Sequence, residues 1–226
     1  MKHILLLALA LPLLALTACT EKEEVSHDFD NWAVRNDQYF ADSLNYARGE
    51  IARAKAAYGD DWERHTPYRL IRSFTLAPEA AAKPSDTIVV RVLRQGTGSG
   101  SPAYTDTAFV NYYGRLMPTE TYPDGYVFDH SGPSARWADV FDPQLCVPTR
   151  FPVTTVSTVS GGSYLTEGFS ATLQHMHIGD LWAIIVHPAL AYGEEDQTKF
   201  PGHSVLRFDV ELKAYYRAGT TPPAWR

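Results

Sequence analysis

Residues 204–212 read SVLRFDVEL, the most regular strand pattern in the chain. Leu206 and Phe208 alternate with Arg207 and Asp209, so one face of this stretch is apolar and the other is charged. Alternation of this kind indicates a strand of an antiparallel sheet that packs one face on a core. The chain is therefore expected to contain such a sheet.

Four earlier stretches have the composition of further strands. Each is rich in β-branched or aromatic residues and is bounded by Gly, Pro, Asp or Ser. They are DTIVVRVLRQG (86–96), DTAFVNYYGRL (106–116), FPVTTVSTV (151–159) and DLWAIIVHP (180–188). Together with residues 204–212 they predict one antiparallel sheet.

A short helix is expected among these strands, in EGFSATLQHMHIG (167–179). Phe169, Leu173 and Met176 are spaced by four and three residues, as on one face of a helix. Gly179 stands where the helix is expected to stop. Because one short helix needs a sheet to pack against, the pattern predicts an α+β domain.

The segment before the sheet is expected to be helical. Its apolar residues are spaced mostly by three and four, which places them along one stripe of a helix. They are Trp32, Phe40, Leu44, Ala47, Ile51, Ala54 and Tyr58. The following segment, as far as Phe74, is expected to hold a further short helix, and LAPEAAAKPSD (76–86) is expected to be a linker.

The N-terminus has the pattern of a bacterial lipoprotein signal. A short basic start precedes an apolar run over 4–16, which is too short to span a bilayer comfortably. LTAC at 16–19 resembles the lipobox, where the signal is cut before a cysteine that is then lipidated; a chance cysteine near a cleavage site is the alternative. Lipidation of Cys19 would anchor the chain to a membrane, and TEKEE (20–24) resembles an acidic surface-export tag.

Charge and cysteine content narrow the function classes. The formal charge of −6, from 20 basic and 26 acidic side chains, disfavours nucleic acid as a partner. Once Cys19 carries lipid, no second cysteine is left to pair with Cys146, so no intrachain disulfide is expected. The patterns divide the chain into a signal peptide (1–18), a tether (19–30), a helical segment and linker (31–84), a sheet domain (85–217) and a C-terminal tail (218–226).

No motif predicts metal, phosphate or nucleophilic chemistry. GTGSG (96–100) is followed by Pro102 and a polar loop, not by the helix N-terminus that a phosphate site needs. His175 and His177 lack a Cys or carboxylate at metal-ligand spacing, and Cys146 lacks a nearby base. What remains is a set of aromatic residues near strand ends, for which core packing and a ligand pocket both stay open.

Five separated stretches, taken together, resemble the signature of FKBP-type peptidyl-prolyl isomerases. They occur in the family's order and at approximately its spacing, over residues 85 to 216. They are VNYYGRL (110–116), DGYVFDHS (124–131), GFSATLQHMHIGD (168–180), PALAYGEE (188–195) and PGHSVLRFDVELKAY (201–215).

The resemblance implies an antiparallel half-barrel sheet wrapped around one short helix. It also implies an aromatic pocket that acts without acid, nucleophile, metal or cofactor. Its walls would be Tyr112, Phe128 and Phe208, and its floor would be Phe169. Asp129 would be a buried carboxylate beside them.

Residues around the pocket entrance follow from the same resemblance. Tyr192 would use its hydroxyl to hold a substrate or inhibitor carbonyl at the rim. Leu165, Thr166 and Phe200 would bind substrate. The chain departs from the family at Thr149, which stands where the P-F-x-F element usually has its aromatic residue.

The resemblance implies that the chain is a peptidyl-prolyl cis-trans isomerase that assists protein folding outside the cytoplasm. Together with the lipobox it implies a lipid anchor in a bacterial outer membrane, on the periplasmic side or at the cell surface. Proline-containing polypeptides and macrolide inhibitors would be its partners, and helix-appended bacterial relatives imply a homodimer through the 32–58 helix. The alternative is a non-catalytic FKBP-like binding module or chaperone on a surface lipoprotein. Turnover of a prolyl peptide separates the two.

The outer face of the sheet is expected to need a cover. Alternate residues of 181–186 face the core, so the others face outward. The outward set is Leu181, Ala183 and Ile185, joined by Phe109 and Tyr113 from another strand. Since a patch of this kind is seldom left open, the 32–58 helix is predicted to cover it, within the chain or across a dimer.

Overall fold

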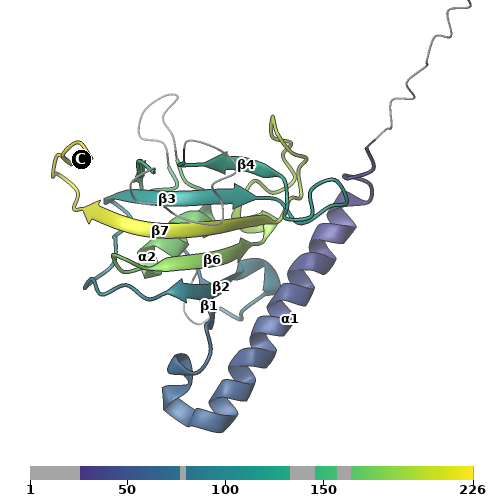
Figure 1. Ribbon diagram of the computed structural model, residues 1–226, viewed down its shortest axis with the longest axis horizontal. Helices are drawn as coiled ribbons and strands as arrows, with labels where there is room; N and C mark the ends of the chain where they lie inside the picture. Colours follow the sequence, from purple (N-terminus) through teal and green to yellow (C-terminus); the bar gives the residue numbers. More distant parts are fainter. Residues whose placement is uncertain (1–25, 77–79, 133–145, 157–163, 226) are drawn as a thin grey trace, which may run out of the picture.

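A computed structural model describes residues 26–76, 80–132, 146–156 and 164–225 (Figure 1). The signal-like segment and Cys19 lie outside the described residues. The α-helices are α1 (Trp32–Tyr58) and α2 (Glu167–His175), and the short 3-10 helices are η1 (Gly59–Arg64), η2 (Pro84–Asp86) and η4 (Pro188–Leu190). No helix in the described ranges has the length and hydropathy to cross a bilayer.

One antiparallel sheet is the centre of the fold. Its strands are β1 (Tyr68–Arg72), β2 (Thr87–Arg94), β3 (Thr107–Arg115), β4 (Val127–His130), β5 (Thr149–Pro152), β6 (Leu181–Val186) and β7 (Leu206–Tyr216). They lie in the order β1-β2-β6-β7-β3-β4, and β5 also pairs with β3. The α+β class and the antiparallel sheet predicted from the sequence are confirmed.

α2 packs against one face of the sheet, which we term the inner face, and the opposite face is the outer face. Phe169 and Leu173 of α2 join the main core together with apolar residues of β2, β3, β6 and β7. The helix ends at His175, earlier than predicted, because Met176 already has extended dihedrals (φ −85°, ψ 151°). Gly179 has φ 94° in the following turn, where Gly96 approaches it closely.

The alternation of β7 is confirmed and defines the two faces. Leu206, Phe208 and Val210 are buried in the core, whereas Arg207 and Asp209 are only half-buried. Burying each large apolar side chain contributes about 1.5–3 kcal/mol, so this pattern fixes the strand's register.

Two strands were not predicted. β1 pairs with β2 and extends the sheet into the segment that was assigned to a helical region and linker. The short helix expected in that segment is the 3-10 helix η1. β4 is a four-residue edge strand, and its sequence VFDH is too short to show an alternation of its own.

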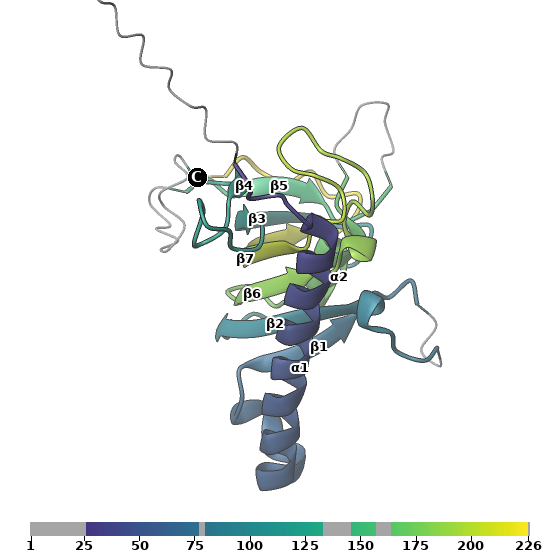
Figure 2. The same cartoon turned by 90° about the vertical axis from the view of Figure 1, so that its right-hand side faces the viewer.

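α1 crosses the strands at the end of the sheet where β7 begins, and its far end projects beyond β1 (Figures 1 and 2). Phe40, Leu44 and Ala47 form a second buried cluster with Val89 and Val205. The middle of the apolar stripe of α1 is therefore occupied by the chain's own sheet, whereas Ile51, Ala54 and Tyr58 lie outside this cluster.

Polar contacts also fasten the start of α1. Trp32 Nε1 donates to Ser204 Oγ at 2.8 Å. Asn36 Oδ1 accepts from the Val205 backbone N–H at 2.8 Å, while Asn36 Nδ2 donates to the Trp32 carbonyl at 2.7 Å. Since Asn36 is completely buried, these bonds satisfy polar groups that water cannot reach.

α1 covers only part of the predicted outer patch. Ile185 packs on the α1 cluster, as expected. Phe109 instead stacks on Trp225 of the C-terminal tail, with ring centroids 5.6 Å apart. Ala183 and Tyr113 line a hollow between the sheet and Tyr39 of α1.

Candidate active site

A pocket of about 210 Å³ opens on the inner face, between β3, β4, β7 and the N-terminal end of α2. All six residues predicted to form the catalytic site line it: Tyr112, Phe128, Asp129, Phe169, Tyr192 and Phe208. They are distant in sequence, so the fold brings them together as the resemblance implied.

The rings form a tight edge-to-face cluster around Phe169. The Phe169 ring lies 5.0 Å from that of Phe208 and 5.9 Å from that of Tyr112, both near perpendicular. Phe128 meets Phe208 in the same way at 5.5 Å. All four side chains are buried, and aromatic pairs of this geometry add about 0.5–1.5 kcal/mol each beyond area burial.

Gly114 explains how two of these rings fit against β3. A Cβ atom at this position would lie 2.7 Å from the Phe128 ring and 2.8 Å from the Phe208 ring. Any side chain would therefore displace a wall of the pocket. The glycine of the VNYYGRL stretch is required by packing at the site.

One hydrogen bond joins the wall to the rim. The Tyr112 hydroxyl donates to Asp129 Oδ2 at 2.8 Å. Burial, followed by the hydrogen bond and charge of Asp129, raises the pKa of Tyr112, so this hydroxyl stays protonated. Asp129 itself is exposed, contrary to the buried carboxylate expected, because it lies on the edge strand β4.

Tyr192 stands at the entrance, where the residue is 38% exposed. It follows η4 in a turn closed by a bond from Gly193 N–H to the Pro188 carbonyl at 2.9 Å, and Gly193 has φ 59°. Burial, and then the Asp129 charge, raise the pKa of Tyr192, so it too presents a neutral hydroxyl.

Comparison with known proteins decides the family. Residues 98–213 match the FKBP-type peptidyl-prolyl cis-trans isomerases. The chain belongs to this FKBP family. The antiparallel sheet with one short helix agrees with that membership, and α1 lies before the matched residues.

Several relatives are similar to the chain over the FKBP domain. The macrophage infectivity potentiator of Trypanosoma cruzi is 33% identical over 136 residues, which cover 60% of this chain and 56% of that protein. The peptidyl-prolyl cis-trans isomerase Mip of Chlamydia trachomatis is 33% identical over 125 residues, 54% of this chain and 38% of that protein. The chain thus spans about half the length of the first relative and less of the second. The crystal structure of FkpA from Escherichia coli is 24% identical with a TM-score of 0.46, covering 86% of this chain and 75% of that one.

Of the three residues predicted to bind substrate, two line the FKBP pocket and one does not. Leu165 and Thr166 line it, and Thr166 Oγ1 is buried without a hydrogen-bond partner in the described parts of the chain. Phe200 is not among the lining residues; it packs behind the wall, with its ring 5.0 Å from Phe128 and 5.8 Å from Tyr192. In this structure Phe200 thus supports the wall residue Phe128 and does not itself line the pocket.

Two residues of the FKBP pocket were missed. Phe151 lines it, with its ring 5.4 Å from Tyr112 and 6.0 Å from Phe169. Phe151 is two residues after Thr149 on the same strand, so both side chains point to the same side of the sheet. This spacing could have predicted Phe151 as a pocket residue. Tyr164 also lines the pocket but is 61% exposed, and no pattern in the sequence marks it.

Proposed function

We propose that the chain is a peptidyl-prolyl cis-trans isomerase that acts on X-Pro bonds of polypeptides outside the cytoplasm and so assists their folding. The observation that carries the proposal is the pocket itself. Its rings are buried edge to face, and its one carboxylate lies at the rim, hydrogen-bonded to a wall.

The chemistry needs no group that attacks or transfers a proton. The barrier to peptide-bond rotation is about 18–20 kcal/mol, because resonance stabilises the planar amide and separates charge within it. A twisted amide has lost that resonance and is less polar. A pocket lined by aromatic side chains, with little water, therefore favours the twisted form over the planar ground state.

Each residue then has a distinct task. Phe128, Phe169 and Phe208 surround the prolyl ring and exclude water. The Tyr192 hydroxyl donates to a substrate carbonyl at the rim. Tyr112 is fixed by its bond to Asp129, which keeps this wall from turning its polar end into the pocket.

Substrate preference follows from the same walls. An apolar residue before proline can rest against Phe151 and Tyr164, which extend the aromatic surface beyond the prolyl site. X-Pro substrates with leucine or phenylalanine before proline are therefore expected to turn over faster than those with glutamate.

The location proposed is a bacterial membrane, with the protein anchored through a diacylated Cys19 and the FKBP domain in aqueous surroundings outside the cytoplasm. The support is the lipobox-like LTAC, which lies outside the described residues. Fatty acid labelling in the host is expected for the wild type and not for Cys19→Ala. Equal labelling of both would refute the anchor.

A homodimer through α1 stays a prediction. Phe40, Leu44 and Ala47 of its apolar stripe pack on the chain's own sheet, so a second copy would have to use the end of α1 beyond them or another face of the helix.

A protease-coupled isomerisation assay on the full chain tests the activity, with a Leu-Pro peptide as substrate and a macrolide as competitor. Acceleration that the macrolide abolishes is expected. Macrolide binding by a folded chain that gives no acceleration over buffer would support the non-catalytic binding module instead.

A further inference from the structure

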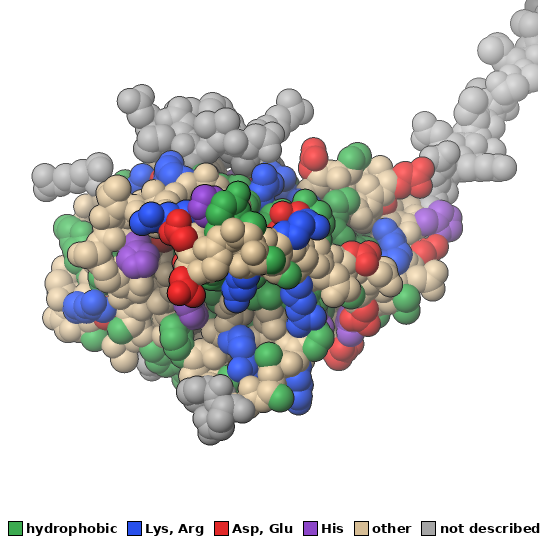
Figure 3. Space-filling model, turned by 90° about the horizontal axis from the view of Figure 1, so that it is seen from below, with side chains coloured by type: hydrophobic (Ala, Val, Ile, Leu, Met, Phe, Trp, Pro, Cys, Tyr) green, Lys and Arg blue, Asp and Glu red, His purple; other side chains and the backbone are tan. Residues whose placement is uncertain are grey.

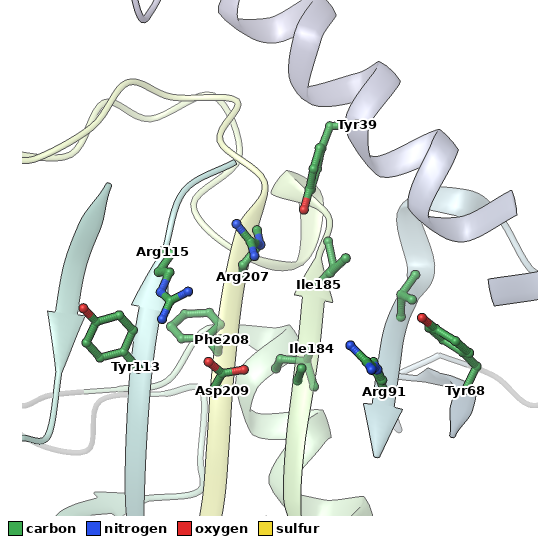
Figure 4. Close-up of a pocket in the computed structure, with 12 residues that line it drawn as sticks. Tyr39, Tyr68, Arg91, Tyr113, Arg115, Ile184, Ile185, Arg207, Phe208 and Asp209 are labelled. Atoms are coloured by element: carbon green, nitrogen blue, oxygen red, sulfur yellow. The ribbon is translucent and has the colours of Figure 1, made fainter. Parts of the chain in front are cut away.

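A second hollow, of about 220 Å³, lies on the outer face of the sheet beside α1 (Figure 4). Its characteristic residues are three tyrosines and three arginines: Tyr39, Tyr68, Tyr113, Arg91, Arg115 and Arg207. It is separate from the isomerase pocket, because β7 divides the two. Phe208 is the one residue that lines both cavities, while its neighbours Arg207 and Asp209 line only the hollow.

The strand register builds the hollow. Ala183 of β6 pairs with Arg91 of β2 on one side and with Asp209 of β7 on the other. A small residue between two long ones leaves a depression in the sheet. In the next row Arg207 and Arg115 are partners on β7 and β3, and Figure 4 shows them near each other across the hollow from Arg91.

The wall nearest the helix is aromatic. Tyr39 extends from α1 over the sheet, and Tyr68 stands on β1 opposite Arg91 (Figure 4). On the far side, the guanidinium of Arg115 lies 4.6 Å from the centre of the Tyr113 ring. Apolar surface from Ile185 completes the lining.

The charge of the hollow is opposite to that of the chain. Its lining has three arginines against one aspartate, whereas the whole chain carries −6. Arg91 is exposed, and its side chain makes no hydrogen bond or ion pair with the residues that the structure describes. Arg207 Nη1 donates to the Asp124 backbone carbonyl at 3.1 Å, a neutral acceptor. Basic side chains also gather in the middle of the molecule seen from the β1 edge (Figure 3).

We propose that this hollow docks an acidic segment of a partner polypeptide, with the partner's carboxylates on Arg91 and Arg207 and an apolar side chain over Ala183. Charge-assisted bonds to arginine are the strong ones, and arginine forks match carboxylates. Tyrosine and arginine are also the residue types enriched at protein–protein hot spots.

The lining favours a peptide over a phosphate or a lipid headgroup. Asp209 stands among the arginines, where it would repel a compact, doubly charged anion but could accept a hydrogen bond from a peptide N–H. The tyrosines, Ile185 and Ala183 offer apolar surface that a phosphate cannot use. A polypeptide with alternating acidic and apolar side chains uses both kinds of surface.

The probe is a fluorescein-labelled peptide of Glu-Leu repeats, added to the full chain and followed by fluorescence anisotropy. We expect saturable binding that weakens as sodium chloride is added, since charges at an open hollow are screened. Arg91→Gln and Arg207→Gln are each expected to weaken binding by roughly two- to fivefold, the usual effect of losing one ion pair at a protein surface. Because Arg91 is exposed, its variant is expected to remain folded.

The matched control removes an arginine elsewhere. Arg48 is an exposed residue of α1 that does not line the hollow, so Arg48→Gln should bind the peptide as the wild type does. A peptide of Gln-Leu repeats should bind at least about tenfold more weakly than the Glu-Leu peptide.

Four outcomes would overturn the proposal. The first two are that the Glu-Leu peptide does not bind saturably, or that the Gln-Leu peptide binds as tightly as the Glu-Leu peptide. The other two are that Arg48→Gln weakens peptide binding as much as Arg91→Gln does, or that inorganic phosphate or phosphatidylglycerol vesicles bind in an Arg91-dependent way and the peptide does not. Isomerisation of a short prolyl peptide should be unchanged in Arg91→Gln. The docking site and the proposed isomerase activity can therefore fail independently.

Discussion

The two faces of the sheet differ in chemistry although the same strands build both. On the inner face, residues such as Phe208 and Tyr112 form an aromatic pocket against α2, in which Asp129 at the rim is the one charged lining residue. On the outer face, Arg207 and Tyr113, each one residue away, line a hollow beside α1 that holds three arginines and an aspartate. The two-residue period of a strand lets one sheet carry two surfaces that need opposite environments.

This difference in chemistry determines how strongly a substitution on each face should act, because the two sites depend on water in different ways. The inner pocket works by excluding it, so loss of a wall should be severe. The outer hollow is lined by charged side chains, and because salt screens charges at a protein surface, a single charge there contributes less. Substitutions on one face should therefore leave the other face's activity unchanged.

The largest effect is expected from Phe128→Ala, which removes a wall ring. Loss of about 1.5–3 kcal/mol of aromatic burial in the transition state corresponds to roughly a ten- to hundredfold fall in kcat/KM. The control is Phe109→Ala, the same substitution on the outer face, where the ring stacks on Trp225. Its kcat/KM on a Leu-Pro peptide should match the wild type.

Circular dichroism and urea unfolding must accompany this pair, because truncating a buried phenylalanine costs about 3–5 kcal/mol of stability. Equal losses of kcat/KM in two folded variants would contradict the separation of the faces.

Asn36→Ala should destabilise the protein without slowing isomerisation. It leaves the Val205 N–H buried and unpaired, a cost of about 1–3 kcal/mol in the free energy of unfolding. Asn45, an exposed residue of α1, gives the matched variant Asn45→Ala, for which little change is expected. If Asn36→Ala is as stable as Asn45→Ala, then α1 is not fastened to the sheet as described.

Tyr192→Phe sharpens the comparison at the rim. It removes one neutral hydrogen bond to substrate, worth about 0.5–1.5 kcal/mol, so kcat/KM should fall roughly two- to tenfold. Tyr122→Phe, at an exposed tyrosine away from the pocket, should have no effect. A loss as great as that of Phe128→Ala would mean that the hydroxyl, and not the dry walls, dominates the barrier.

The smallest effect concerns His203, which links the two regions. Its Nε2 contacts Asp37 of α1 at 2.8 Å, and its Nδ1 contacts Glu194, next to the Tyr192 turn, at 2.6 Å. The hydrogen bond to Asp37, and then that to Glu194, raise the pKa of His203 above its usual 6.5, although burial opposes them.

A raised pKa means that protonation favours the folded state. The stabilisation is fully present below pH 6.5 and is lost as the pH rises through the folded-state pKa. His203→Asn keeps a residue that tolerates the observed φ of 56° and removes the titration. The difference in unfolding free energy between wild type and variant should shrink by up to about 1 kcal/mol above that pKa. A difference that stays constant with pH would refute the role of His203.

Local patterns predicted what depends on neighbours in sequence. The alternation around Phe208 placed β7 correctly, and the spacing of Phe169, Leu173 and Met176 located α2. The six aromatic and acidic site residues came from the family resemblance, since nothing local distinguishes a pocket phenylalanine from a core one. Five of the six lie as expected, and Asp129 lines the pocket but is exposed.

The rest depends on pairing between distant strands. Phe200 fell behind the wall because the loop from η4 to β7 folds back on Phe128, which no spacing reveals. The outer hollow exists because β2, β6 and β7 align Arg91, Ala183 and Asp209 in one row. That alignment depends on the order of the strands in the sheet, which the sequence of a single strand does not predict.

The measurement that most directly tests the central claim is two-dimensional exchange NMR of a Leu-Pro peptide with the full wild-type chain. Uncatalysed X-Pro exchange takes tens to hundreds of seconds, too slow for cross-peaks between the cis and trans signals in a short mixing time. We predict cross-peaks at catalytic amounts of protein, together with shifts of Tyr192 and the wall residues. Shifts of those residues with no cross-peaks would contradict the isomerase and leave a pocket that only binds.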